Sequence, residues 1–189
     1  MPAFSARLEL ALRFAAEAHR DQVRKQTAIP YITHPFHVAL LLERHGFDEE
    51  TSIVALLHDV VEDARVPIEA IEQAFGRGVA DAVAALTEPE KNIPWETRKR
   101  RYLEQIARGP QRALAVAAAD KLHNLRTIAL DLQAGEDVFA RFSRGAAVSI
   151  AYYREFVSLV RSCLDHPLVS ELAAALREVE ERAADAGIL

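Results

Sequence analysis

Residues 53–63 read IVALLHDVVED, and this stretch indicates how the chain folds. Its first five residues are apolar on every side, so a helix formed there belongs in the centre of the core. Asp48 is a residue type that caps a helix at its N-terminal end. Charged side chains next to a buried run are costly unless they have partners. The stretch therefore predicts a central helix whose end carries His58 and Asp59 toward partners elsewhere in the fold.

The sequence on either side of this helix also has helical periodicity. Leu8 and the apolar residues after it share one face of a first helix, and Thr33 can cap a second helix that ends at Gly46. Prolines that stand where helices commonly begin are Pro67, Pro94, Pro110 and Pro167. A further long helix is expected over residues 138–163. Strand patterns are scarce, so we predict an all-α fold, a bundle of about eight or nine helices.

The size of the chain predicts one domain. It has 189 residues, of which 50% are hydrophobic and 27% charged, which is the composition of a globular protein. We expect a single domain over residues 1–189. Its motif-bearing part covers about residues 10–130, and C-terminal helices over residues 136–185 complete the bundle.

Charge and cysteine content restrict the possible functions. A net charge of -5 is unfavourable for binding a nucleic acid polymer, whereas a small anionic ligand needs only a local positive group or a bound cation. Cys163 is the only cysteine, so any metal must use histidine and carboxylate ligands. No apolar run approaches the roughly 18 residues of a membrane span, and we expect a cytoplasmic protein that does not bind membranes.

Histidine and acidic residues occur at three places beside apolar helical patterns. His34 begins one helix, and His58 and Asp59 follow the central run. Asp120 follows another apolar run in residues 117–124, AAADKLHN. Together these residues form a mixed nitrogen and oxygen set, which suits Mn²⁺, Fe²⁺ or Zn²⁺ and is poor for Ca²⁺.

Two further carboxylates, Glu62 and Asp63, come soon after Asp59. On a continuous helix, residues four apart share a face, as His58 and Glu62 do. Carboxylates placed so close together repel one another unless a cation is present. The pattern therefore favours a metal site with additional acidic groups at its edge.

The order of these residues resembles the HD superfamily of metal-dependent phosphohydrolases. More narrowly, four runs resemble the hydrolase domain of the RelA/SpoT alarmone enzymes: AHRDQVRK at 18–25, PYITHP at 30–35, ALLHDVVED at 55–63 and ADKLHNLRT at 119–127. The chain is too short to add the synthetase domain of the long enzymes. The resemblance is therefore to the stand-alone small alarmone hydrolases, a group that includes the metazoan SpoT homologue.

This resemblance implies removal of the 3′-pyrophosphate from ppGpp or pppGpp, usually with Mn²⁺. It assigns metal binding to His34, His58, Asp59 and Asp120. It assigns the handling of the attacking water to the acidic pair Glu62 and Asp63. It assigns substrate binding to Arg24, Lys25, Asn124 and Thr127, with Arg98 as a further position near the phosphates.

Other interpretations stay open at this point. An HD phosphohydrolase with another substrate, such as ppApp, NADPH or a nucleoside monophosphate, would share the same metal ligands. A non-catalytic module that binds a nucleotide and signals to a partner is a third possibility, although such a module has no need of Glu62 and Asp63. The basic cluster over residues 98–101 is also read more simply as a solvated helix face. The C-terminal helices are a candidate surface for a homodimer.

Overall fold

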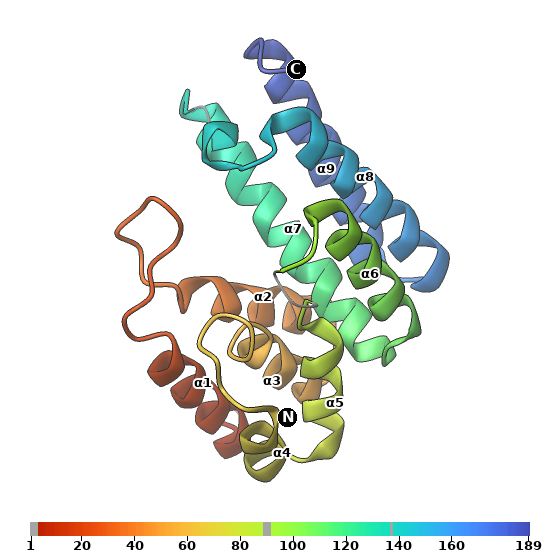
Figure 1. Cartoon of the computed structure of the whole chain (residues 1–189). Helices are drawn as coiled ribbons and strands as arrows, with labels where there is room; N and C mark the ends of the chain where they lie inside the picture. The colour runs from red at the N-terminus through yellow and green to blue at the C-terminus, as the bar shows by residue number, and fades with distance from the viewer. Residues whose placement is uncertain (1–3, 89–91, 137) are drawn as a thin grey trace. The chain divides into compact units, whose positions relative to one another are not determined.

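A computed structural model of the protein describes residues 4–88, 92–136 and 138–189 (Figure 1). These residues form nine α-helices and one short 3-10 helix: α1 (Ala6–Ala18), α2 (Thr33–Arg44), α3 (Glu49–Leu57), α4 (Ile68–Phe75), α5 (Arg77–Leu86), α6 (Trp95–Arg108), α7 (Gln111–Gln133), η1 (Val138–Arg141), α8 (Gly145–Cys163) and α9 (Pro167–Asp185). Within these ranges there is no β-strand, only an isolated antiparallel bridge between Val23 and Pro30. The predicted all-α fold is confirmed.

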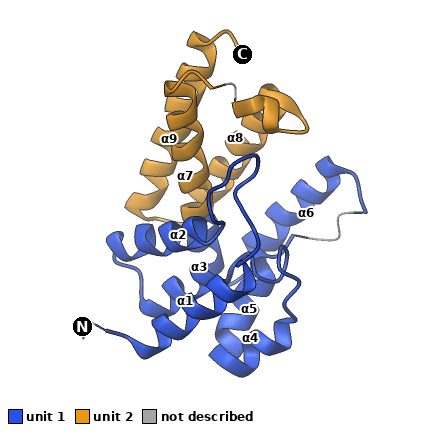
Figure 2. Cartoon of the chain, turned by 90° about the vertical axis from the view of Figure 1, so that its left-hand side faces the viewer, with its two compact units in different colours: residues 1–117 blue, residues 118–189 orange. Residues whose placement is uncertain are grey.

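The contacts of the chain divide it into two compact units, Met1–Ala117 and Ala118–Leu189, and the boundary falls inside α7 (Figure 2). The prediction of a single domain is not tested by this division and stays a prediction. No described helix combines the length and the apolar character needed to cross a membrane.

Helix α3 lies at the centre of the first unit, as its apolar sequence predicts. It packs against α1, α2 and α5, and every residue from Thr51 to Leu57 is buried. Asp48 caps it, because its carboxylate accepts a hydrogen bond of 2.8 Å from the N–H of Thr51. Arg112, in the first turn of α7, donates to this carboxylate at 3.0 Å and pairs with Glu50 at 2.9 Å. These contacts fix the N-terminal end of the central helix.

The end of α3 differs from the prediction. The helix ends at Leu57, and residues 58–64 form turns, so the site residues do not continue one regular helix. The imidazole Nδ1 of His58 lies 2.6 Å from the carbonyl oxygen of Ala55, which is the oxygen that the next helical turn would use. A helix-like hydrogen bond from the N–H of Asp63 to the oxygen of Asp59 persists at 2.9 Å. Arg65 then adopts a positive φ of 58° and the chain turns away.

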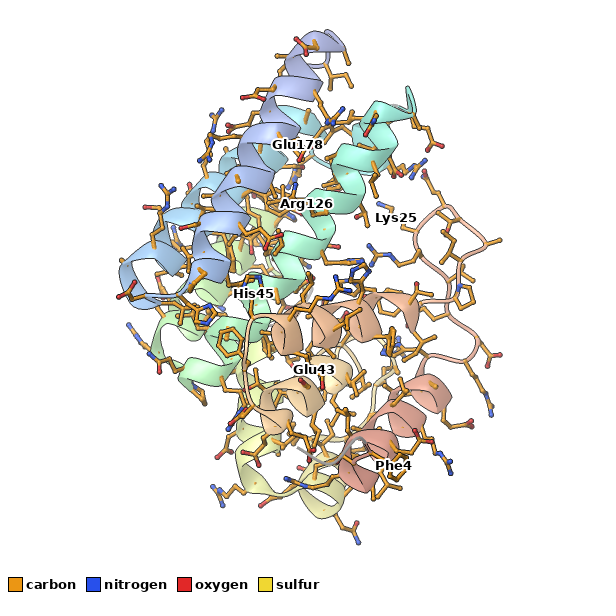
Figure 3. The ribbon with its side chains drawn as sticks, turned by 180° about the vertical axis from the view of Figure 1, so that it is seen from behind. Phe4, Lys25, Glu43, His45, Arg126 and Glu178 are labelled. Atoms are coloured by element: carbon orange, nitrogen blue, oxygen red, sulfur yellow. The ribbon has the colours of Figure 1, made fainter. Side chains whose placement is uncertain are left out.

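The second unit contains the rest of α7 together with η1, α8 and α9. Helix α8 packs against α9 and η1, and the largest fully buried side chains here include Leu122, Leu125 and Phe156. Arg126 on α7 pairs with Glu178 on α9 at 2.6 Å (Figure 3). The prediction of one long helix over residues 138–163 is wrong. Gly145 has a φ of +69°, a left-handed conformation that a continuous right-handed helix does not contain, so η1 and α8 are separate.

Candidate metal centre

His58 stands at the C-terminal end of α3 with only 4% of its side chain exposed. A carbonyl oxygen can only accept a hydrogen bond, so the contact of Nδ1 with Ala55 requires the ring proton on Nδ1. The neutral ring then presents the lone pair of Nε2. Fixing one ring nitrogen on a backbone carbonyl in this way is how proteins orient a metal-binding histidine.

His34 presents a second imidazole to the same place. It is the second residue of α2, and 2% of its side chain is exposed. The rings of His34 and His58 have their centroids 5.3 Å apart, and each ring offers a ligand atom within 4.8 Å of the other. Two buried imidazoles from different helices thus lie together, as the sequence predicts.

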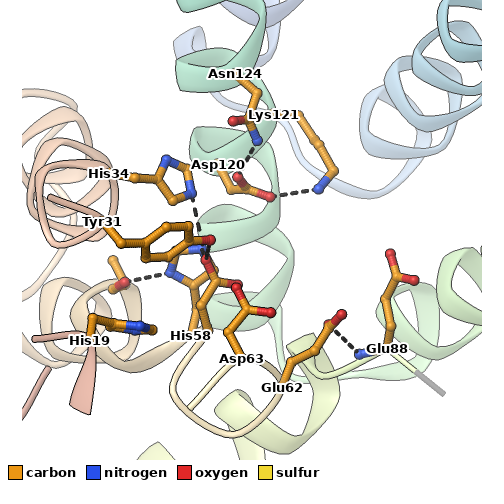
Figure 4. A network of polar contacts seen from close by, with 12 residues as sticks. His19, Tyr31, His34, His58, Glu62, Asp63, Glu88, Asp120, Lys121 and Asn124 are labelled. Carbon is orange, nitrogen blue, oxygen red and sulfur yellow. Dashed lines mark hydrogen bonds and ion pairs between the residues drawn. The ribbon is translucent and has the colours of Figure 1, made fainter. Parts of the chain in front are cut away.

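The carboxylate of Asp59 faces the rings of His34 and His58, which Figure 4 shows together. Its Oδ2 atom lies 3.1 Å from Nε2 of His58 and 3.7 Å from Nε2 of His34. The hydroxyl of Tyr31 donates a hydrogen bond of 2.7 Å to the same oxygen. Asp59 is therefore held from one side by Tyr31 while it faces both histidines.

This arrangement fits a divalent cation. In the neutral tautomer fixed by Ala55, Nε2 of His58 and Oδ2 of Asp59 are both acceptors, and two acceptors 3.1 Å apart repel unless a positive species lies with them. His34, His58 and Asp59 offer two nitrogens and an oxygen, which is a donor set suited to Mn²⁺, Fe²⁺ or Zn²⁺. The cluster has the composition of a metal centre.

Asp120 belongs to the second unit, where it is buried on α7 with 7% exposure. The amide of Asn124 donates to its Oδ1 at 2.6 Å, and the ammonium of Lys121 lies 2.6 Å from its Oδ2. The carboxylate is thus oriented by the residue one turn later. The hydroxyl of Thr127 donates to the carbonyl oxygen of Asn124 at 2.9 Å. The predicted substrate contacts of Asn124 and Thr127 stay predictions.

The acidic pair after Asp59 lies in the turns that follow α3. Oε2 of Glu62 accepts a hydrogen bond of 3.3 Å from the N–H of Glu88, and Oδ2 of Asp63 accepts one of 3.1 Å from the amide of Gln22. Glu62 is partly buried and Asp63 is exposed. Both carboxylates are therefore tethered, each by a donor from a different segment of the first unit.

The predicted basic residues have partners of their own. Arg24 lies over the ring of Tyr31, with its guanidinium carbon 5.7 Å from the ring centroid, and Lys25 follows it on the loop after α1 (Figure 3). Arg98 pairs with Glu88 at 2.9 Å, and Lys99 pairs with the same carboxylate. The side chains of Arg98 and Lys99 are 18% and 19% exposed, so they do not form the solvated face that the charge pattern suggested. Arg100 and Arg101 are exposed.

The sequence did not single out three residues that the structure brings to this site: His19, Gln22 and Tyr31. Tyr31 contacts Asp59, Gln22 contacts Asp63, and His19 contacts Gln22. His19 is 2% exposed and lies at the C-terminal end of α1. A signal was present, because His19 and Gln22 lie in the motif run 18–25 and Tyr31 lies in the motif run 30–35.

The first unit also has an apolar pocket of about 220 Å³ between α1, α2 and α3. Leu8, Phe36 and Leu56 contribute to its wall, and Phe4 and Glu43 lie at it as well (Figure 3). None of the predicted site residues lines it. The wall of this pocket therefore contains neither of the buried histidines.

Comparisons with known proteins agree with this geometry. The model of the HD domain family matches residues 11–144. The guanosine-3′,5′-bis(diphosphate) 3′-pyrophosphohydrolase MESH1 of Xenopus tropicalis is 36% identical over 166 residues, which cover 85% of this chain and 92% of that protein. MESH1 of Drosophila melanogaster is 37% identical over 134 residues, covering 69% of this chain and 74% of the relative.

Solved structures agree as well. One is a metazoan orthologue of SpoT that hydrolyses ppGpp. It is 30% identical, with a TM-score of 0.74 and coverage of 100% of both chains. A protein from Listeria monocytogenes EGD-e is 35% identical, with a TM-score of 0.72 and coverage of 78% of this chain and 99% of the other.

Fold and site together define an all-helical protein whose centre of two buried histidines and an aspartate is of the kind that binds a divalent metal. The match of the family model to most of the chain identifies it further. The protein belongs to the HD domain family, as its sequence motifs predict.

Proposed function

We propose that this protein hydrolyses guanosine alarmones, removing the 3′-pyrophosphate of ppGpp or pppGpp with a divalent metal. The relatives that match over most of their length carry this activity in their names. The observation that carries the proposal is the convergence of His34, His58 and Asp59, with His58 fixed in the tautomer that leaves Nε2 for a metal. A protein that only bound nucleotides would have no need of such a centre.

His34, His58 and Asp59 would hold the metal, and Asp120 would be the fourth ligand. Asp120 matches the family's motif position, and the hydrogen bond from Asn124 presets its carboxylate. We propose Mn²⁺, the ion that the family resemblance implies, with Zn²⁺ and Fe²⁺ as alternatives, because imidazole and carboxylate ligands suit all three. When bound, the cation lowers the pKa of water and offsets phosphate charge.

The reaction is a displacement at phosphorus. Water attacks the phosphorus attached to the 3′ oxygen, the bond from that phosphorus to the 3′ oxygen breaks, and pyrophosphate leaves. Glu62 and Asp63 accept the proton that the attacking water loses, and a proton must reach the 3′ oxygen of the nucleotide. Each carboxylate is oriented by a hydrogen-bond donor on one of its oxygens, and a carboxylate held in this way can accept a proton from water.

Substrate recognition falls to the basic and polar residues around the centre. Arg24 is a planar cation suited to stacking on a base, and it already lies over the ring of Tyr31. Lys25, Asn124 and Thr127 complete the proposed contacts with the nucleotide. Arg98 is held by Glu88, and its contact with the phosphates requires exchange of that carboxylate for phosphate.

A substrate panel tests the proposal. Metal-free protein is given Mn²⁺ and then ppGpp, ppApp, NADPH or dAMP, and released pyrophosphate and phosphate are separated by chromatography. We expect pyrophosphate from ppGpp. Phosphate from NADPH or dAMP alone would contradict the alarmone assignment. The absence of product from all four substrates would contradict the proposal that the protein is an enzyme.

A matched pair of variants ties the activity to the site. His34→Ala removes a buried imidazole from the start of α2, whereas His37→Ala removes an exposed imidazole from the same helix. We expect turnover to be lost in the first variant and kept in the second. Equal turnover in both would exclude His34 as a ligand.

A further inference from the structure

Three side chains, those of His19, Gln22 and Asp63, connect the end of α1 to the acidic pair, and Figure 4 shows the first and the last of them. His19, which caps α1, has its Nδ1 atom 2.7 Å from Oε1 of Gln22. The amide nitrogen of Gln22 then donates to Oδ2 of Asp63 at 3.1 Å. His19 is 2% exposed, so this series of hydrogen bonds begins in the core and ends at the exposed carboxylate of Asp63.

The direction of these hydrogen bonds is fixed by chemistry. The carboxylate of Asp63 only accepts, so the group that faces it must be the NH₂ of the amide. The amide oxygen therefore faces His19, which must donate from Nδ1. Exchanging the two ends of the Gln22 amide would place its oxygen against Asp63 and break that contact.

The backbone holds Gln22 in the same place. Its N–H donates to the carbonyl of His19 at 2.9 Å, and its own carbonyl accepts from the N–H of Tyr31 at 2.9 Å. The ring of Tyr31 packs against the ring of His19, with centroids 4.9 Å apart. Since Tyr31 also donates to Asp59, the segment anchored by His19 supplies one hydrogen bond to the proposed metal ligand and one to the acidic pair.

We infer that Gln22, oriented by His19, is a positioning residue that holds Asp63 ready to accept the proton of the attacking water. This inference rests on the proposed function, because it gives Asp63 its role there. An exposed aspartate samples several rotamers, and a donor on Oδ2 selects one of them. Gln22 touches neither metal nor reacting atoms and acts only through Asp63.

The principal variant is Gln22→Leu, which keeps the volume and removes the amide. We expect kcat to fall roughly 10- to 100-fold, the range for loss of such supporting hydrogen bonds, while KM and the Kd for Mn²⁺ change less than about twofold. Gln73→Leu, on the exposed side of α4, is the matched control and keeps the activity of the wild type. A fall in Mn²⁺ affinity equal to the fall in kcat would overturn the inference, because it would place the effect on the metal ligands.

A double-mutant cycle separates positioning from a general structural role. In an Asp63→Asn background, Gln22→Leu should cause no further fall in kcat, because the group it positions has lost its function. An undiminished further fall in that background overturns the inference. His19→Asn, whose amide nitrogen is attached to Cγ as Nδ1 is, should retain more activity than His19→Leu. Equal losses of activity in these two variants would show that His19 does not orient Gln22.

One readout needs neither metal nor substrate. In metal-free protein, the side-chain amide NMR signal of Gln22, assigned by its loss in Gln22→Leu, should shift in Asp63→Asn. An unchanged chemical shift would show that Gln22 does not donate to Asp63, and this would overturn the inference. Inactivity of the wild type across the substrate panel would contradict the proposed function, whereas an active wild type with an equally active Gln22→Leu would contradict only this inference.

Discussion

The hydroxyl of Tyr31 donates a hydrogen bond of 2.7 Å to Oδ2 of Asp59, the oxygen that also faces both histidines. These two residues are 28 positions apart in the chain. The bond fixes the orientation of a carboxylate that is 21% exposed. Tyr31 therefore prepares Asp59 for a cation without being a ligand itself.

Tyr31→Phe should weaken Mn²⁺ binding roughly tenfold, because the variant removes the donor and keeps the ring that packs on His19. Titration calorimetry of the metal-free protein measures the Kd directly. Tyr102→Phe, which removes a buried phenol from α6, is the control for loss of a hydroxyl group. A Tyr31→Phe protein with the Kd of the wild type would show that Asp59 needs no such support.

Asp59→Ala should abolish Mn²⁺ binding and turnover and leave a folded helical protein. Binding of Mn²⁺ to the folded state raises the Tm of the wild type, since a ligand at 100 times its Kd adds about 2.7 kcal/mol to the free energy of unfolding. We expect no such rise in Asp59→Ala, measured by circular dichroism with and without Mn²⁺. Asp21→Ala, at a side chain that is 91% exposed, should keep the rise. Retained Mn²⁺-dependent activity in Asp59→Ala would refute the site.

Much of the fold was predictable because its signals are local. Apolar spacing lies within the helices that it specifies, and helices begin within a few residues of Asp48 and of the helix-starting prolines. The meeting of His34 with His58 was predicted because both flank buried helical runs. The HD family and the all-α class are confirmed, and the predicted alarmone activity agrees with the names of the relatives.

The parts that sequence reasoning missed depend on contacts between distant segments. Gln22 reaches Asp63 across 41 positions, and Tyr31 reaches Asp59 across 28, through a loop whose course has no periodicity to read. The cluster around Arg98 looked like a solvated face because Glu88 lies ten positions earlier, beyond one helical turn. The break before α8 rests on the single left-handed φ of Gly145, which composition does not reveal.

Glu88→Gln should lower KM for an alarmone several-fold at low ionic strength. The Glu88 carboxylate, 12% exposed, neutralises Arg98 and Lys99, and its removal leaves both cations to the substrate phosphates. The decrease in KM should become smaller as salt is added, because salt screens the attraction between charges. Glu104→Gln, at an exposed position of α6, controls for net charge. An unchanged or higher KM in Glu88→Gln would remove Arg98 from the proposed substrate contacts.

The lowered pKa of Asp48 makes the stability of the first unit depend on pH. Burial acts to raise the pKa of this carboxyl group, but hydrogen bonds from the side chain and N–H of Thr51 and from Arg112 outweigh it, so the pKa is lowered. A carboxyl group with a lowered pKa in the folded state stabilises the protein above its unfolded pKa of about 3.9. That stabilisation disappears as pH falls through the lower folded value.

Asp48→Ala should therefore reduce the free energy of unfolding by about 1 kcal/mol at pH 7, the usual value of an N-cap. The difference from the wild type should narrow as the pH is lowered below about 4, where the wild-type carboxylate is protonated too. Urea unfolding at a series of pH values measures both quantities. Asp81→Ala, at a side chain that is 60% exposed on α5, should reduce the free energy of unfolding by less than Asp48→Ala does. A difference that stayed constant from pH 7 to pH 3 would mean that the charge of Asp48 does not stabilise the start of α3.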